Sequence, residues 1–130
     1  MAEELNNEFD VQVRLQKQFE ESVAEKVKNH QGLNDVEIAH LCPVALKDQM
    51  SEGEIKKLGL SKHYSFVPTM KVVNDLRELG YDCVDATQVK ARKKSTNGYQ
   101  KHMLTFEHPK YKVDNSEEYP QILLTNSHDG

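Results

Sequence analysis

The sequence contains no tryptophan, and aromatic residues fill only 7% of its 130 positions. Aliphatic side chains must therefore supply most of a hydrophobic core, and 37% hydrophobic residues allow a modest one. No run of 18 or more apolar residues is present, so the sequence predicts no membrane-spanning segment. Its first residues, MAEELNNEFD, are acidic and polar, and they lack the basic start and apolar stretch of a secretory signal.

Cysteine is also scarce, with Cys42 and Cys83 forming no spaced disulfide framework. His40 and Cys42 make an H-x-C pair, but a zinc site needs four ligands in a tetrahedral arrangement, and the spacing for that is absent. We interpret both cysteines as small buried hydrophobic residues, and no cofactor is indicated. A reduced, cytoplasmic protein is expected.

Charge is present but unevenly distributed. The net charge is −4, yet residues 90–102 carry five basic side chains and no acidic one. The remaining residues then hold 12 basic and 21 acidic groups, a balance of −9. A basic patch on an otherwise acidic protein predicts contact with an anionic partner.

Apolar residues recur every four positions near the start of the chain, at Leu15, Phe19, Val23 and Val27. This spacing predicts an amphipathic helix over residues 8–29. Its apolar stripe either covers the core or pairs with the same helix of a second copy.

Three shorter helices are expected next. VEIAHL forms one that Pro43 ends, and Ser51 with Glu54 has the spacing of a capping box that starts another. A third begins at Thr69 and ends at Gly80. Its apolar face is predicted to consist of Met70, Val73, Leu76 and Leu79.

From Tyr81 onward the apolar period changes to two, which predicts three antiparallel strands. YDCVDATQVKA has Cys83 or Val84 facing inward, and the Asn97-Gly98 turn leads into YQKHMLTFEH. There, Leu104 and Phe106 share one face, opposite Met103 and Thr105. QILLTN is expected to be central or covered on both faces, because three apolar residues follow one another.

Helices followed by strands indicate an α+β fold, with the helices packed on a small, mainly antiparallel sheet. We expect one domain over residues 1–130. It comprises an N-terminal amphipathic helix in residues 1–32 and an α+β core in residues 33–130.

Four motifs carry a resemblance to a known family: Tyr64 to Thr69 (Y-x-F-V-P-T), Gly80 to Val84, Lys101 to Phe106, and Asn126 to Gly130 (N-S-H-D-G). Over roughly residues 35–130, the chain resembles the N-terminal part of a phage- and plasmid-encoded family of domains of unknown function. Members of that family continue past NSHDG with a further helix and strands. The resemblance implies an origin in a mobile element and a bacterial host cell, and it implies no particular reaction.

NSHDG places Ser127, His128 and Asp129 in a row, the three side-chain types of a hydrolytic triad. A triad requires them to converge, with His between the other two, whereas neighbours in an extended chain point to alternate sides. We favour a structural interpretation, in which Asp129-Gly130 begins a turn and Asn126 and Ser127 bond to backbone.

A metal site is the alternative for the same residues. His128 and Asp129 are possible ligands, with His102 or His63 joining across the sheet. Ligand spacing of the H-E-x-x-H or C-x-x-C kind is absent, so we predict no metal and no catalytic residue.

The basic hairpin is the strongest candidate site. Lysine and arginine side chains on a two-stranded ribbon can follow a phosphate backbone, and an aromatic ring can stack on a base. The alternative is a solvated loop that binds nothing. The predicted contacts to nucleic acid or another anionic partner are Lys90, Arg92, Lys93, Lys94, Tyr99, Lys101 and His102.

Self-association is also expected. QILLT is apolar enough to lie inside a sheet, but the residues that follow it in longer relatives are missing, so we expect unpaired backbone groups and uncovered apolar surface there. Such an edge invites pairing with another chain. We predict a homodimer, or a heteromeric partner that covers this surface, with Ile122 and Leu124 at or near the contact.

The sequence therefore predicts a non-enzymatic binding protein of a phage or mobile element, which contacts nucleic acid or a nucleic-acid-handling complex. One alternative is an anti-defence protein, such as an anti-CRISPR inhibitor, that binds a host complex. Another is a truncated fragment of a metal-dependent enzyme.

Overall fold

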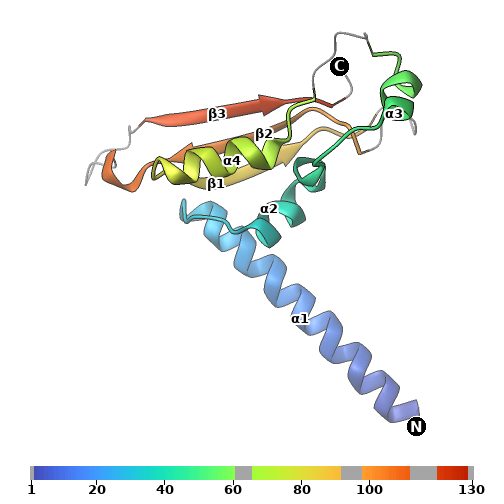
Figure 1. Cartoon of the computed structure of the whole chain (residues 1–130). Coiled ribbons are helices and arrows are strands. Elements are labelled where there is room, and N and C mark those ends of the chain that lie inside the picture. Colours follow the sequence, from blue (N-terminus) through green and yellow to red (C-terminus); the bar gives the residue numbers. More distant parts are fainter. Residues whose placement is uncertain (1, 61–65, 92–97, 112–119, 129–130) are drawn as a thin grey trace.

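The computed structural model describes residues 2–60, 66–91, 98–111 and 120–128, with side chains from residue 7 onward. Along the chain lie α1 (Ala2–Lys28), α2 (Asp35–Leu41), a 3-10 turn (Pro43–Leu46), α3 (Glu52–Lys57) and α4 (Thr69–Glu78). The strands are β1 (Asp82–Gln88), β2 (His102–Glu107) and β3 (Gln121–Asn126), with a second 3-10 turn at Pro109–Tyr111. Helices come first and an antiparallel sheet follows, which confirms the α+β prediction (Figure 1).

The described strands form a sheet in the order β1-β2-β3, and both neighbouring pairs are antiparallel. β3 therefore lies at the edge, and the prediction that it is central or covered on both faces is wrong. Its side chains alternate: Ile122 and Leu124 are half-buried, while Leu123 between them is 60% exposed. The three consecutive apolar residues therefore point alternately to the two faces of an edge strand.

β1 contains a register shift between Cys83 and Asp85 where it pairs with β2. Such a bulge adds one residue to a strand and leaves it without a partner across the ladder. Cys83 and Val84 are both buried as a result, although strict alternation would bury only one of them.

The front face of the sheet, seen in Figure 1, is covered by α4. Val73 at the centre of α4 is fully buried, as are Leu104 and Phe106 of β2 beneath it. Met70 and Leu76 are half-buried, but Leu79 is 68% exposed, so the predicted fourth member of this face is incorrect. Leu79 follows the last helical residue, where the chain turns away toward Gly80, which has a φ of +94°.

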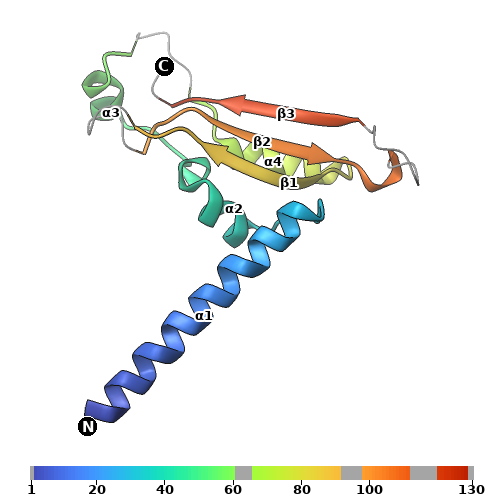
Figure 2. The ribbon, with the colours of Figure 1, turned by 180° about the vertical axis from the view of Figure 1, so that it is seen from behind.

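The back face carries no helix across its middle within the described residues (Figure 2). Met103 and Leu123 are exposed there. His30 lies in the turn after α1, and its Nδ1 is 2.5 Å from Oε2 of the buried Glu107. This contact joins the helix to the last residue of β2.

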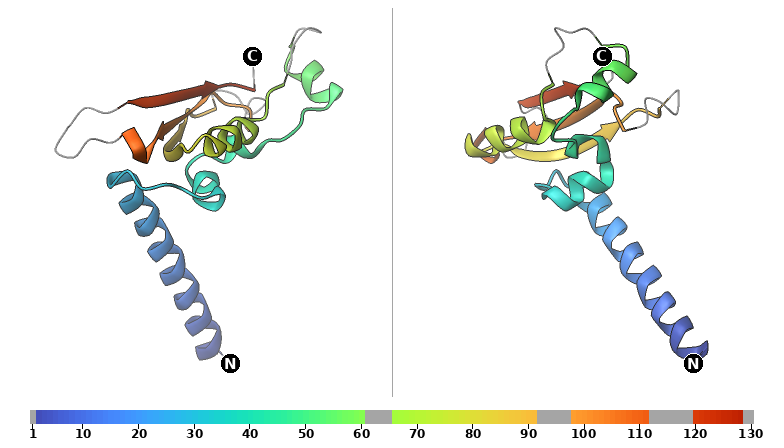
Figure 3. Two further views of the ribbon diagram at one scale, coloured as in Figure 1. Left: turned by 60° about the vertical axis from the view of Figure 1, so that its left-hand side comes forward. Right: turned by 45° about the vertical axis from the view of Figure 1, so that its right-hand side comes forward.

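α1 extends farther toward the N-terminus than the sequence predicts, and most of its length projects away from the sheet (Figure 3). Only its last turns are anchored to the body. Val23 is 1% exposed, and Lys26 forms an ion pair with Glu37 of α2, with 2.9 Å between Nζ and Oε1. In the part of the chain that the structure describes, none of the helices could span a lipid bilayer.

Candidate functional site

The two strands of the basic hairpin remain paired beyond the ends of β1 and β2. The backbone N–H of Val89 donates to the carbonyl of Lys101 at 3.0 Å. Lys90 and Lys101 are both exposed, so two of the predicted cations lie at the base of the hairpin on neighbouring strands. The predicted contacts Arg92, Lys93 and Lys94, and also Asn97 of the turn, lie outside the described residues.

Tyr99 is fixed in place at the hairpin base. Its hydroxyl donates to Oε2 of Glu54 at 2.6 Å, and the ammonium group of Lys47 lies 4.6 Å from the centre of its ring. Hydrogen bonds to the Glu54 carboxylate, from Lys47 first and then from Tyr99 and the backbone of Ser51, hold its pKa at about 2. Tyr99 therefore anchors the hairpin to α3, and a base stacking on its ring would have to use the face that Lys47 leaves open.

His102 was predicted to lie at the surface with its basic neighbours, but it is buried. It is 2% exposed, and it lies on the same face of β2 as Leu104 and Phe106. Burial lowers the pKa of its imidazole, which favours the neutral ring. In this position His102 stabilises the fold and does not contact a partner directly.

The neutral ring of His102 belongs to a directed chain of hydrogen bonds. Its Nδ1 donates to the carbonyl of Gln100 at 2.8 Å, so its Nε2 accepts from the hydroxyl of Thr69 at 2.6 Å. Thr69 in turn accepts from the side-chain amide of Asn126 at 3.1 Å. Thr69 begins α4, His102 begins β2 and Asn126 ends β3. These hydrogen bonds therefore hold the three elements together.

His128, in the middle of the NSHDG segment, lies against this network. The backbone N–H of His128 donates to the carbonyl of Tyr99 at 3.0 Å, and its ring is fully buried. Ring centroids lie 4.7 Å from Phe66 and 5.1 Å from His102. His128 is therefore packed inside the protein, which favours a structural role for it.

Asn126 and Ser127 bond to backbone, as the sequence predicts. The Asn126 amide donates to the carbonyl of Val67 at 2.9 Å, and its oxygen accepts from the N–H of Ser127 at 2.9 Å. The predicted turn at Asp129 and Gly130 lies outside the described residues.

The cysteines behave as buried hydrophobic residues. Cys42 and Cys83 are free thiols in one core cluster, and burial raises the pKa of both, that of Cys83 to about 12. His40 is exposed, and its ring lies edge-on to Phe19 with 5.2 Å between centroids. Within the described ranges, no group of three His, Cys, Asp or Glu side chains is placed to hold a metal ion.

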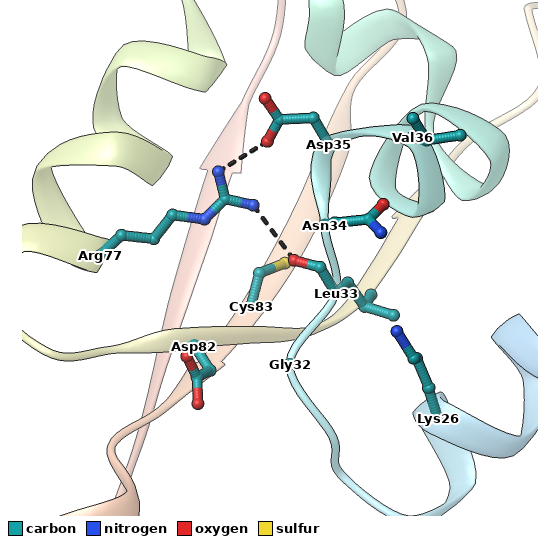
Figure 4. Close-up of a pocket in the computed structure, with 9 residues that line it drawn as sticks. All are labelled: Lys26, Gly32, Leu33, Asn34, Asp35, Val36, Arg77, Asp82 and Cys83. Atoms are coloured by element: carbon teal, nitrogen blue, oxygen red, sulfur yellow. Dashed lines mark hydrogen bonds and ion pairs between the residues drawn. The ribbon is translucent and has the colours of Figure 1, made fainter.

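An open hollow of about 590 Å³ lies between α4, the end of α1 and the start of α2 (Figure 4). Arg77 dominates it, but its guanidinium already donates to Asp35 Oδ1 at 2.6 Å and to the carbonyl of Leu33 at 3.1 Å. The charges of Lys26 and Arg77 are balanced by those of Asp35 and Asp82, which also line the hollow. Arg77 therefore joins α4 to the segment that connects α1 with α2. The four charged side chains that line the hollow sum to zero, so it offers no net charge to a ligand.

Ile122 and Leu124 face α4 and pack against the core. The exposed side chains of β3 are Gln121, Leu123 and Thr125. A chain that paired with this edge would bond to the backbone of β3, while the side chains of β3 point to the two faces of the sheet.

The sequence brought His102 near His128 only as a possible metal site, and it missed the buried cluster that both form with Thr69 and Asn126. A signal for this cluster exists in the sequence. Every second position from 122 to 128 holds one of a set, namely Ile122, Leu124, Asn126 and His128, so alternation alone places them on one face. His30 and Glu107, 77 positions apart, offered no comparable signal.

A model of a family described as a domain of unknown function (DUF932) matches residues 59–130, more than half of the chain. Two proteins of Escherichia coli (strain K12), UPF0380 protein YafZ and UPF0380 protein YfjQ, are each 25% identical to it over 117 residues. Those alignments cover 90% of this chain but 39% of either relative, so the chain spans about two fifths of their length. No solved structure matches it.

Proposed function

Because this chain belongs to the DUF932 family, whose description assigns no activity, its function has to be inferred from its own residues. We propose that it is a non-enzymatic binding protein whose basic hairpin contacts nucleic acid or a nucleic-acid-handling complex. We further propose that it originates from a phage or another mobile element and acts in the cytoplasm of a bacterial host.

The observation that carries this proposal is the separation of charge. Five cations and no anion occupy residues 90–102, while the rest of the chain is acidic. Lys90 and Lys101 are exposed on adjacent strands, which lie roughly 5 Å apart in a sheet. Two ammonium groups so placed suit neighbouring phosphates of one strand of nucleic acid.

Replacing Arg92, Lys93 and Lys94 together with Ala tests the proposal. We expect affinity for single- or double-stranded DNA or RNA to fall by on the order of tenfold or more at low salt, because three phosphate contacts are removed. A matched control replaces three exposed lysines of other elements, Lys28, Lys71 and Lys110, and causes the same loss of charge. Equal losses in the two variants would mean that the hairpin is not the binding surface.

A second candidate rests on the acidic remainder of the surface. Outside residues 90–102 the chain has 12 basic and 21 acidic groups. An anti-defence protein such as an anti-CRISPR inhibitor would use such a surface to imitate nucleic acid and occupy a host complex. If the unaltered protein binds no nucleic acid even at low salt, this candidate takes the lead.

A truncated metal-dependent enzyme is the remaining alternative from the sequence, and no cluster among the described residues favours it. Metal analysis of the purified protein is its direct test. A stoichiometric bound ion would reopen this alternative.

A further inference from the structure

Besides the hairpin, one further segment of the chain contains lysines and no acidic residue. Residues 55–74 hold four lysines and no Asp or Glu. When this segment and the hairpin are both set aside, the rest of the chain has 8 basic and 21 acidic groups. More than half of the cations of the protein are thus concentrated in two segments that are separate in the sequence.

The structure brings these two basic segments together at Tyr99. Just before residue 55, Glu54 of α3 accepts a hydrogen bond from the Tyr99 hydroxyl at 2.6 Å. Farther along, the ring of Phe66 packs on His128, and the backbone N–H of His128 donates to the Tyr99 carbonyl at 3.0 Å. α3 therefore lies beside the base of the hairpin, at one end of the sheet (Figure 2).

The side of α3 that faces the hairpin is the side that carries Glu54. In a helix, a residue three positions later lies on nearly the same side, and a residue two positions later lies on the opposite side. Lys57 therefore shares the side of Glu54, whereas Lys56 points away from the hairpin, as Glu52 does. Both lysines are exposed, and neither forms an ion pair in the part of the chain that the structure describes.

The acidic group nearest to Lys57 on this side is already balanced. Glu54 is ionised, because hydrogen bonding, chiefly from Lys47, holds the pKa of its carboxyl group at about 2. The Nζ of Lys47 lies 2.7 Å from Oε2 of this carboxylate, so the pair sums to zero. Lys71, which also belongs to residues 55–74, pairs with Asp75 on α4 at 3.2 Å. Lys57 is therefore the cation of this segment that stands beside the hairpin with its charge uncompensated.

We propose that Lys57 belongs to the nucleic-acid surface, so that α3 and the hairpin together bind one phosphodiester backbone. This inference rests on the proposed function of the hairpin and extends its binding surface to a second element. Contacts to phosphate fix the register and orientation of a nucleic acid on a protein. Two elements that are held together at Tyr99 fix them more strictly than a hairpin alone. The Tyr99 hydroxyl is then a positioning group, because it holds α3 against the hairpin.

Two neighbouring lysines test the proposal. Lys57→Ala removes the cation on the hairpin side of α3, and Lys56→Ala removes the same charge from the opposite side. The readout is the slope of log K against log salt for the full chain, with duplex and single-stranded oligonucleotides as separate probes. Each lost phosphate contact makes that slope shallower by about 0.9 on duplex DNA and by about 0.7 on a single strand. We expect this change for Lys57→Ala and an unchanged slope for Lys56→Ala, and the probe that shows it identifies the form of nucleic acid.

The junction at Tyr99 has its own test. Tyr99→Phe keeps the ring but removes the hydroxyl that donates to Glu54. Because α3 is then no longer held against the hairpin, the loss of affinity caused by Lys57→Ala should shrink by about twofold or more in the Tyr99→Phe background. A merely structural role of the hydroxyl would lower the thermal midpoint and leave the effect of Lys57→Ala unchanged. Additive effects of the two substitutions would thus contradict the positioning role of Tyr99.

Three results would overturn the assignment of Lys57. The first is a slope that Lys57→Ala leaves unchanged on both probes, and the second is an equal effect of Lys57→Ala and Lys56→Ala. Both leave the proposed function intact as long as the Arg92, Lys93 and Lys94 to Ala variant still loses affinity. The third is no binding of any probe by the unaltered chain, which would refute the proposed function as well. The thermal midpoint reports folding in each variant.

Discussion

His102 illustrates how charge patterning and strand alternation lead to different conclusions about one residue. It closes the basic stretch in the sequence, and that stretch suggested a contact with a partner. Alternation along β2 places it instead with Leu104 and Phe106, and the structure buries it. Alternation prevails because an inward-facing position removes a side chain from solvent whatever its neighbours are.

Thr69 tests the importance of the buried network. Thr69→Val keeps the shape of the side chain but removes the hydroxyl that donates to His102 Nε2 and accepts from Asn126. We expect a loss of about 1–3 kcal/mol in the free energy of unfolding, measured by denaturant titration, because buried polar groups lose partners. Thr87→Val, on the exposed back face of β1, is the control and should stay within about 0.5 kcal/mol. A loss of the same size at Thr87 would contradict this interpretation of the network.

The helices and strands were largely predictable because their signals are local. Ser51 and Glu54 form the predicted capping box, and Gly59 and Gly80 take the positive φ values expected where a helix ends. The bulge beside Cys83 was not predictable, because nothing in the alternation of β1 shows where an extra residue enters. The edge position of β3 was misjudged because Leu123 lies between two core residues and resembles them in sequence.

α4 offers a matched pair of leucines that separates burial from mere hydrophobicity. Leu76→Ala should cost about 2 kcal/mol of unfolding free energy, at the lower end of the range for core leucines, because Leu76 is half-buried against the core. Leu79→Ala, three residues farther along and 68% exposed, should change it by less than about 0.5 kcal/mol. Thermal or denaturant unfolding distinguishes the two, and equal costs would place the helix at a different rotation.

At the scale of the whole molecule, the sequence predicted the presence of α1 but not its position. The stripe at Leu15, Phe19 and Val23 is continuous in the sequence, so the point where the body stops covering it is set by distant contacts. Among these are the ion pair of Lys26 with Glu37 and the approach of His30 to Glu107. The candidate binding surface was predicted in part: Lys90 and Lys101 are exposed as expected, while Tyr99 is fastened to Glu54 and His102 is buried.

The dependence of nucleic-acid affinity on salt tests the central claim most directly. Fluorescence anisotropy with labelled DNA and RNA, at salt concentrations from about 50 to 200 mM, gives the slope of log K against log salt. If two to five hairpin cations contact phosphates of duplex DNA, that slope should lie between about −1.8 and −4.5. The Arg92, Lys93 and Lys94 to Ala variant should give a shallower slope, while the Lys28, Lys71 and Lys110 to Ala control keeps the original one. Absence of binding at the lowest salt, or a slope that the hairpin variant leaves unchanged, would contradict the account.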